Sequence, residues 1–153
     1  FINHLKKISL EKSLKGKNID KNIIREEIFN NTKKRKLLEN YVHIEVKKSR
    51  DIFLKKHKQK KTKIIFLDIP LLFENKLEKI CDWTILFYAP LKTRKKRAIK
   101  RKGMQKKTLE KIIKSQLSDK IKKKKADFIV DTSANKSQSL NEVLKIIELI
   151  KNK

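Results

Sequence analysis

The chain has 153 residues, of which 38% are hydrophobic and 39% are charged, and its formal net charge at pH 7 is +26. This length accommodates one domain of ordinary size with a modest core. The single cysteine, Cys81, excludes an internal disulfide and suits a reducing compartment. No apolar run approaches the roughly 20 residues of a membrane-spanning helix, and no signal-peptide pattern opens the chain, so we expect a cytoplasmic protein without a membrane partner.

The excess positive charge is spread along the whole chain as lysine. Only six of the 43 basic residues are arginine, whereas proteins that read base edges usually favour arginine, whose planar group pairs bidentately. We therefore interpret the lysines as a biased, solvated surface over an ordinary core. A basic nucleic-acid-binding protein, of the ribosomal type, remains the alternative interpretation.

Two helices are predicted in the first 60 residues. Residues 1–18 carry only a weak apolar pattern, which Gly16 interrupts. Asp20 is suited to cap a helix that ends near Asn30. A longer helix is predicted over about residues 33–57, because its apolar side chains fall mostly on one face.

Strands and helices alternate over the rest of the chain, which predicts an α/β fold with a parallel sheet. Three apolar runs predict the strands, at residues 64–68, 83–88 and 127–131. A loop with a helical turn is expected between the first two strands. Three helices are predicted, one from Pro90 to Gly103, one around 109–117, and one that begins with a capping box at Ser139–Glu142.

Chemistry is expected at the end of the first predicted strand, because ligands bind beyond the carboxyl ends of strands in open α/β sheets. Asp68 closes that strand and Glu74 follows shortly after it. Two elements later, Arg94, Arg97 and Arg101 lie along one face of a helix. Phosphoryl transfer needs both kinds of group, carboxylates for the metal or the attacking hydroxyl and arginines for the phosphoryl oxygens. Such a basic row is also typical of an ordinary solvated helix face.

The segment Asp68-Ile69-Pro70-Leu71-Leu72-Phe73-Glu74 resembles the DxPLLFE signature of the dephospho-coenzyme A kinase family. The resemblance covers about residues 19–150, and several motifs in the family's order make it specific. The other matching residues are Ile19, Asp20, Ile28, Phe29, Arg35, Leu38, Glu39, His43, Arg97, Arg101, Gly103, Met104, Gln116, Lys122, Ala126, Asp127 and Asp131.

The resemblance implies ATP-dependent phosphorylation of the ribose 3′-hydroxyl of dephospho-coenzyme A, the last step of coenzyme A synthesis, with ATP and Mg²⁺. The implied fold is a P-loop kinase of the nucleoside-monophosphate kinase type, with a three-layer parallel sheet. Residues 1–153 would be a single partial kinase domain. Residues 19–60 would form an acceptor-binding helical region, residues 98–122 a lid, and the remainder core sheet and helices.

The resemblance also implies roles for individual residues. Arg97 and Asp68 would be catalytic, Arg97 at the transferring phosphates and Asp68 near the acceptor and Mg²⁺, the latter through a water. Residues on the acceptor side would be Leu71, Leu72, Phe73, Glu74 and His43, and those of the lid and ATP site would be Arg101, Gln116 and Lys122. On chemistry alone, Asp68 could cap a turn and His43 could be a hydrogen-bonded structural residue.

A phosphate-cradling G-x-x-x-x-G-K-[ST] loop does not occur in these 153 residues, whose only glycines are Gly16 and Gly103. The family places this loop on its first strand, and an acidic Asp-x-Asp segment after its second. Because the chain begins at Phe1, we expect a sequence that lacks the first (P-loop) strand and the second strand. We expect this fragment alone neither to fold cooperatively nor to phosphorylate an acceptor, in contrast to a full-length gene product.

Two alternatives of a different kind remain open. One is another P-loop kinase that phosphorylates a nucleotide or small metabolite, which only the acceptor would distinguish. The other is a truncated, inactive relative retained as a binding module. Small departures from the family pattern are Ile44, where a proline usually follows His43, and residues 132–134, where the family tends to have an asparagine and a glycine near the adenine.

Overall fold

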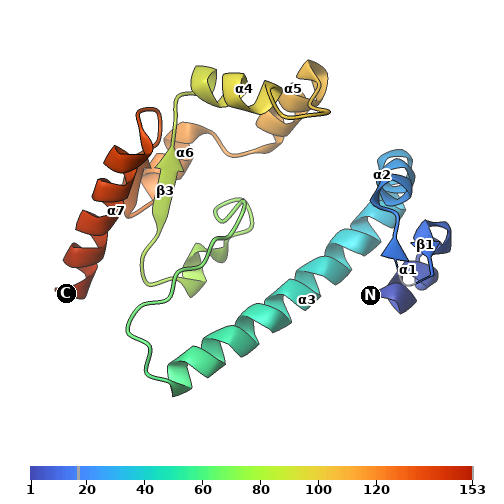
Figure 1. Cartoon of the computed structure of the whole chain (residues 1–153), viewed down its shortest axis with the longest axis horizontal. Coiled ribbons are helices and arrows are strands. Elements are labelled where there is room, and N and C mark those ends of the chain that lie inside the picture. The colour runs from blue at the N-terminus through green and yellow to red at the C-terminus, as the bar shows by residue number, and fades with distance from the viewer. Residues whose placement is uncertain (17, 153) are drawn as a thin grey trace. The chain divides into compact units, whose positions relative to one another are not determined.

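The computed structural model of the chain describes residues 1–16 and 18–152. These residues form two compact units, divided between Leu67 and Asp68 (Figure 1). The predicted acceptor region lies in the first unit and the predicted lid in the second. Among the described residues, no helix combines the length and the apolar composition that crossing a membrane requires.

The first unit is a short N-terminal segment followed by two helices, the second of which is long (Figure 1). The strands β1 and β2 pair as an antiparallel hairpin. The elements in order are α1 (Ile2–Lys7), η1 (Glu11–Ser13), β1 (Leu14–Lys15), β2 (Asn18–Ile19), α2 (Lys21–Asn30) and α3 (Thr32–Gln59).

A small apolar core holds the N-terminal segment of this unit in place. Leu5, Ile8 and Leu10 are buried in it. Partly buried side chains of β1, β2, α2 and α3 pack against these three residues. The weak pattern of residues 1–18 did not predict this structure, because each element is too short to show a period and depends on packing rather than propensity.

The two predicted helices of this unit are confirmed, and each begins at a side-chain cap. The Asp20 carboxylate accepts hydrogen bonds from the backbone N–H of Asn22 (3.0 Å) and Ile23 (3.4 Å). At the start of α3, the Asn31 side-chain oxygen accepts from Lys34 N–H (3.0 Å). The same asparagine therefore ends α2 and opens α3.

The second unit combines a parallel pair of strands with helices, so the predicted α/β class is confirmed. The helix α7 packs against β4, and α4 packs against α5. The elements in order are η2 (Leu77–Ile80), β3 (Ile85–Tyr88), α4 (Leu91–Ile99), α5 (Lys106–Ser115), α6 (Asp119–Lys125), β4 (Phe128–Asp131) and α7 (Lys136–Lys151).

The strand predicted at residues 64–68 is not formed. These residues carry no strand assignment and no ladder partner within the described part of the chain. An apolar run gives a strand only where a neighbouring backbone completes its hydrogen bonds, which is a property of the sheet and not of the run.

Two predicted helix ends are also wrong. The helix α4 ends at Ile99, and Gly103 lies in a separate turn beyond it with φ of +80°. The helix α7 begins at Lys136, where the Asn135 side chain accepts from Gln138 N–H (2.9 Å). The expected cap Ser139 instead donates its hydroxyl to the carbonyl of Asp131 (2.9 Å), so tertiary contact replaces the capping box.

Three hydrogen bonds between Thr84 and Asp127 hold the first ends of β3 and β4 together. The Thr84 N–H and Oγ1 donate to Asp127 Oδ2 at 2.8 and 2.7 Å, and the Asp127 N–H donates to Thr84 Oγ1 at 3.1 Å. Thr84 is 5% exposed, so water cannot readily replace these bonds.

We predict that Thr84→Val loosens this strand pair. The substitution keeps the β-branched shape but removes the hydroxyl that both donates to and accepts from Asp127. A hydrogen bond to a charged group contributes about 1.5 kcal/mol or more, so amide hydrogen exchange at residues 128–131 should accelerate roughly tenfold. Thr108→Val on the exposed face of α5 is the matched control. Equal exchange in both variants would contradict the role of Thr84.

Candidate functional site

The carboxyl ends of β3 and β4 lie side by side, because the strands are parallel and Tyr88 is in register with Asp131. Thr132 donates both its N–H (2.7 Å) and its hydroxyl (2.9 Å) to the carbonyl of Tyr88. Arg97, from α4, donates from Nη2 to the carbonyl of Thr132 (2.7 Å). The predicted catalytic arginine is therefore placed at the edge of the sheet where α/β folds bind ligands.

Charged groups of both signs gather at this edge. The hydrogen bonds from the Ser133 side chain and backbone, followed by the charges of Lys123 and Arg97, hold the pKa of Asp131 below its ordinary value. The Lys123 Nζ lies 3.5 Å from the centre of the Tyr88 ring, a cation–π contact. Arg97 and Lys123 are both exposed and available to an anion.

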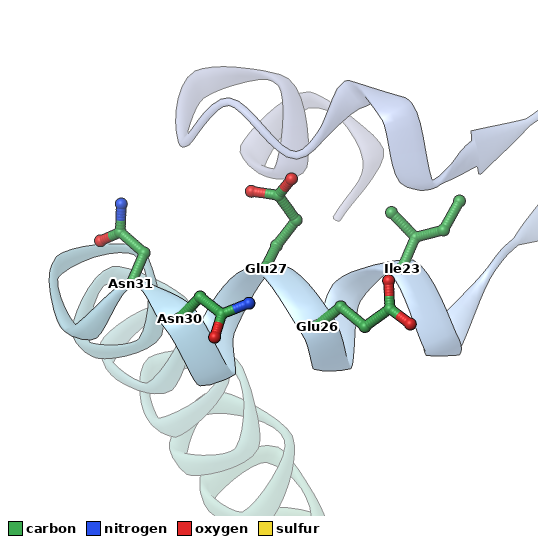
Figure 2. Close-up of a pocket in the computed structure, with 5 residues that line it drawn as sticks. All are labelled: Ile23, Glu26, Glu27, Asn30 and Asn31. Carbon is green, nitrogen blue, oxygen red and sulfur yellow. The ribbon is translucent and has the colours of Figure 1, made fainter.

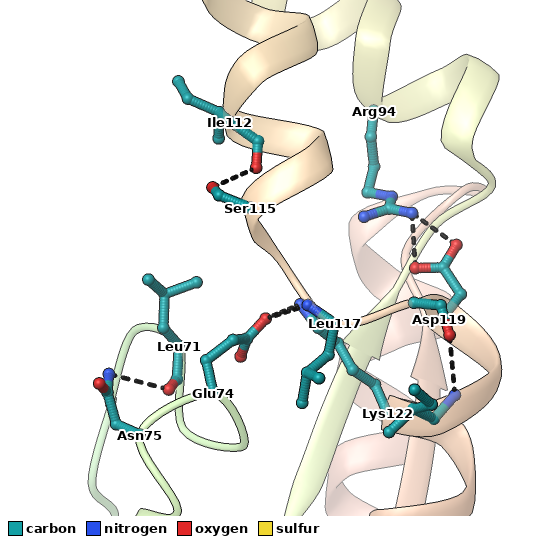
Figure 3. Close-up of polar contacts among 11 residues, drawn as sticks. Leu71, Glu74, Asn75, Arg94, Ile112, Ser115, Leu117, Asp119 and Lys122 are labelled. Atoms are coloured by element: carbon teal, nitrogen blue, oxygen red, sulfur yellow. Dashed lines mark hydrogen bonds and ion pairs between the residues drawn. The ribbon is translucent and has the colours of Figure 1, made fainter.

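The segment 68–74, called the signature loop from here on, has a defined conformation. Leu71 adopts a left-handed backbone with φ of +56°, which costs a non-glycine residue about 1 kcal/mol. Its carbonyl accepts hydrogen bonds from the backbone and side-chain N–H groups of Asn75 at 3.0 and 3.1 Å (Figure 3). The Leu71 side chain is 45% exposed and Asp68 is also exposed, whereas Phe73 is buried at 5%.

The last residue of the signature loop, Glu74, binds to the segment around α6. Its Oε1 accepts from Lys122 Nζ (2.8 Å) and from Leu117 N–H (3.1 Å) (Figure 3). The side chains of Glu74 and Lys122 are each 14% exposed. Burial raises the pKa of Glu74, but the hydrogen bonds from Lys122 and the backbone, with the Lys122 charge, outweigh it and the pKa lies below its ordinary value.

Arg94 is a structural residue and not part of a solvated basic row. Its Nη2 binds both carboxylate oxygens of Asp119 (2.6 and 2.5 Å) (Figure 3). Its Nε donates to the carbonyl of Ala89 (3.0 Å). Asp119 lies in the first turn of α6, where a carboxylate is favourable. Asp119 could not be identified from the sequence, because a single acidic residue among lysines carries no signal of its own.

The remaining predicted residues have separate positions. Arg101 is exposed in the turn after α4, and Gln116 is half-buried where α5 ends. His43 is exposed on α3, in the first unit. Within the described residues, the structure thus brings Glu74 into contact with Lys122, and places Arg97 at the sheet edge, while His43 belongs to the other unit.

A basic pocket of about 440 Å³ lies on the surface of α4. It is lined by Lys92, Thr93, Lys96, Arg97 and Lys100. Its charge suits an anionic group, and it contains the predicted catalytic arginine.

A second pocket, of about 360 Å³, lies along α2 and reaches the start of α3 (Figure 2). Its lining includes the carboxylates of Glu26 and Glu27 and the amides of Asn30 and Asn31. Glu27 is already bound to Lys34 Nζ (2.6 Å). The predicted site residues are not among those that line this pocket.

The family model described as dephospho-CoA kinase matches residues 5–138. The chain belongs to the dephospho-CoA kinase family. A dephospho-CoA kinase of Fusobacterium nucleatum is 35% identical over 137 residues, which cover 89% of this chain and 69% of that protein. One of Bartonella quintana is 37% identical over 126 residues, which cover 82% and 65%. The chain spans about two thirds of the length of these relatives.

Solved structures agree with this family assignment. The crystal structure of TT1252 from Thermus thermophilus matches 96% of this chain and 74% of its own, with a TM-score of 0.74 and 26% identity. A dephospho-CoA kinase from Campylobacter jejuni matches 97% of this chain and 74% of its own, with a TM-score of 0.66 and 29% identity. The family and the kinase-like fold class predicted from the motifs are therefore confirmed, and the family match extends back to residue 5.

We predict that Lys122→Met raises the pKa of Glu74 above its wild-type value, because it removes the hydrogen bond and the charge that favour the carboxylate. The pKa is lower in the folded chain than in the unfolded one. The ion pair therefore contributes fully to stability above about pH 4.5, and this contribution is lost as the pH falls through the folded pKa.

A titration of the Glu74 carboxyl carbon by NMR measures this change. Lys125→Met is the matched control, since Lys125 binds Glu78 instead. The role given to Lys122 would be wrong if both variants left the Glu74 midpoint where it is in the wild type.

Proposed function

We propose that this chain supplies the acceptor-binding and lid parts of an enzyme that transfers the γ-phosphoryl group of ATP to the ribose 3′-hydroxyl of dephospho-CoA. The observation that carries the proposal is the attachment of the signature loop to the predicted lid through Glu74, in a chain of the dephospho-CoA kinase family. The acceptor is the substrate that the relatives are named for.

We assign the phosphate side of the reaction to Arg97, Arg101 and Gln116, with Lys122 acting through its pair with Glu74. The position of Arg97 at the carboxyl ends of β3 and β4, with Lys123 beside it, supports its role. A guanidinium there can stabilise the charge that spreads over the phosphoryl oxygens during transfer. The lid residues would close over ATP and exclude water, which strengthens these interactions.

We assign the acceptor side to residues of the second unit, Asp68, Leu71, Leu72, Phe73 and Glu74, with Glu74 acting through its hold on the loop. The role of His43, in the first unit, stays a prediction. The exposed side chain of Leu71, held in a left-handed turn, supports a contact role because a non-glycine residue in this conformation is often part of a binding site. Phe73 is buried and would support the loop from beneath, without direct contact.

Mg²⁺ is compatible with Asp68 as its protein partner. Among the described residues there is no group of three or more histidine, cysteine or acidic side chains that could enclose a metal. Magnesium in kinases commonly binds through one or two carboxylates together with substrate phosphates and waters, and the exposed carboxylate of Asp68 fits that open arrangement. The ion would neutralise charge on the ATP phosphates when bound.

The partners that we propose are therefore the small molecules ATP and dephospho-CoA. A reducing, cytoplasmic location is in keeping with the single cysteine and with this substrate pair. The lysine excess is interpreted as surface composition and not as a nucleic-acid interface.

Calorimetric titration of the 153-residue chain with dephospho-CoA tests the proposal directly. The signature loop lies within a compact unit of this chain, so we expect saturable binding of dephospho-CoA in the presence of ATP and Mg²⁺, although we do not expect the whole chain to unfold cooperatively. The absence of a phosphate-cradling loop from this sequence leads us to expect acceptor binding without turnover. A chain that binds neither dephospho-CoA nor ATP, at concentrations up to millimolar, would refute the proposed function.

We predict that Leu71→Asp weakens dephospho-CoA binding at least tenfold, because it replaces an apolar contact of about 1.5 kcal/mol with a charge beside a phosphorylated ligand. Leu140→Asp is the matched control, since Leu140 is 57% exposed on α7 and Leu71 is 45% exposed. The titration above measures both variants. Equal affinities would remove Leu71 from the acceptor site.

A further inference from the structure

Glu74 joins two segments of the second unit that are 43 residues apart in sequence, since its carboxylate accepts from the N–H of Leu117 and is paired with Lys122. We propose that Glu74 is a positioning residue that couples the signature loop to the lid, so that acceptor binding at residues 68–74 orders α5. The identity of the acceptor rests on the proposed function, but the contact of Glu74 with Leu117 and Lys122 does not.

The contact is made at the point where the lid would pivot. Residues 116–118 form the linker between α5, which ends at Ser115, and α6, which begins at Asp119. Leu117 lies in the middle of this linker, and Figure 3 shows the carboxylate of Glu74 directed at its backbone nitrogen. A single side chain of the signature loop therefore fixes the base of α5.

The start of α6 is held independently of Glu74. Arg94 binds both carboxylate oxygens of Asp119, and it also donates a hydrogen bond to the carbonyl of Ala89, just after β3. The Ser118 hydroxyl also caps α6 by accepting from Ile121 N–H (3.4 Å). Release of Glu74 should consequently free the linker and α5, while α6 stays in place.

The pair is sheltered enough for its charge to matter. Both side chains are 14% exposed, so water screens the attraction less than at an open surface. Replacing the carboxylate with an amide keeps an oxygen for Leu117 but leaves the Lys122 ammonium without a countercharge. A neutral amide oxygen also accepts the Leu117 N–H less strongly than a carboxylate does, so the loop would lose most of its hold on the linker.

A direct ligand role for Glu74 predicts a different result. A carboxylate that only touched the acceptor would alter acceptor affinity, and the exchange of linker amides without ligand would not change. A positioning residue alters that exchange before any ligand is added. The two roles are therefore separable by one measurement on the same variant.

Hydrogen exchange measured by mass spectrometry on the full chain provides this test. In Glu74→Gln, we expect exchange at residues 106–118 to accelerate at least tenfold, with residues 85–88, 119–125 and 128–131 unchanged. Saturating dephospho-CoA should slow exchange of α5 in the wild type and have little effect in the variant. Lys122→Met leaves the carboxylate without its countercharge and should also accelerate exchange at residues 116–118, whereas Lys122→Arg, which keeps the pair, should exchange like the wild type.

Glu110→Gln on the exposed face of α5 is the matched control and should exchange like the wild type. Wild-type exchange of residues 106–118 in Glu74→Gln without ligand would overturn the proposal. If Glu74→Gln also accelerated exchange in the strands, which would report loss of folding, the Lys122 variants decide instead. Equal exchange at residues 116–118 in Lys122→Met and Lys122→Arg would then overturn the proposal. If dephospho-CoA binds in the calorimetric titration but leaves exchange of α5 unchanged in the wild type, the coupling is overturned. If it does not bind at all, the proposed function fails, while the ligand-free comparison still decides whether Glu74 anchors the linker.

Discussion

The parallel pairing of β3 with β4 is the constraint on which the second unit depends. The first ends are held by the bonds between Thr84 and Asp127, and the last ends by Thr132 on the carbonyl of Tyr88. Because both strands point the same way, every connection that follows them starts from one edge. Arg97 reaches that edge from α4. The parallel direction of the two strands thus determines where the site lies, and the individual side chains determine its chemistry.

Two ion pairs then fix the elements around this edge, and both use carboxylates in a chain that has few. The chain has 17 acidic residues against 43 basic ones. Glu74 and Asp119 are each bound to one cation at close distance, and the hydrogen bonds from Lys122 and the backbone lower the pKa of Glu74 in spite of its burial. In so basic a protein, many cations could pair with a given carboxylate. The position of Glu74 is therefore fixed by a backbone donor, the N–H of Leu117, as well as by charge.

Local chemistry could be predicted from the sequence, and contacts between distant residues could not. The cap at Asp20 and the parallel strand at β3 followed from residue type and pattern. The strand expected at 64–68 needed a partner that the pattern cannot supply. The family motifs identified Glu74 and Lys122 separately, but only the folded chain reveals that they bind each other. The sequence pattern places Arg94 in a basic row with Arg97 and Arg101, because nothing in the sequence marks Asp119 as its partner.

The left-handed turn at Leu71 sets backbone strain against side-chain contact at a single position. Glycine would adopt this backbone without the penalty that a β-carbon brings, so a more stable version of the loop is one substitution away. A leucine there lowers stability through backbone strain and leaves an apolar side chain exposed to water. Substitution by glycine would relieve the backbone strain and remove the exposed apolar side chain in one step, so a loss of affinity that accompanied a gain in stability would come from the side chain.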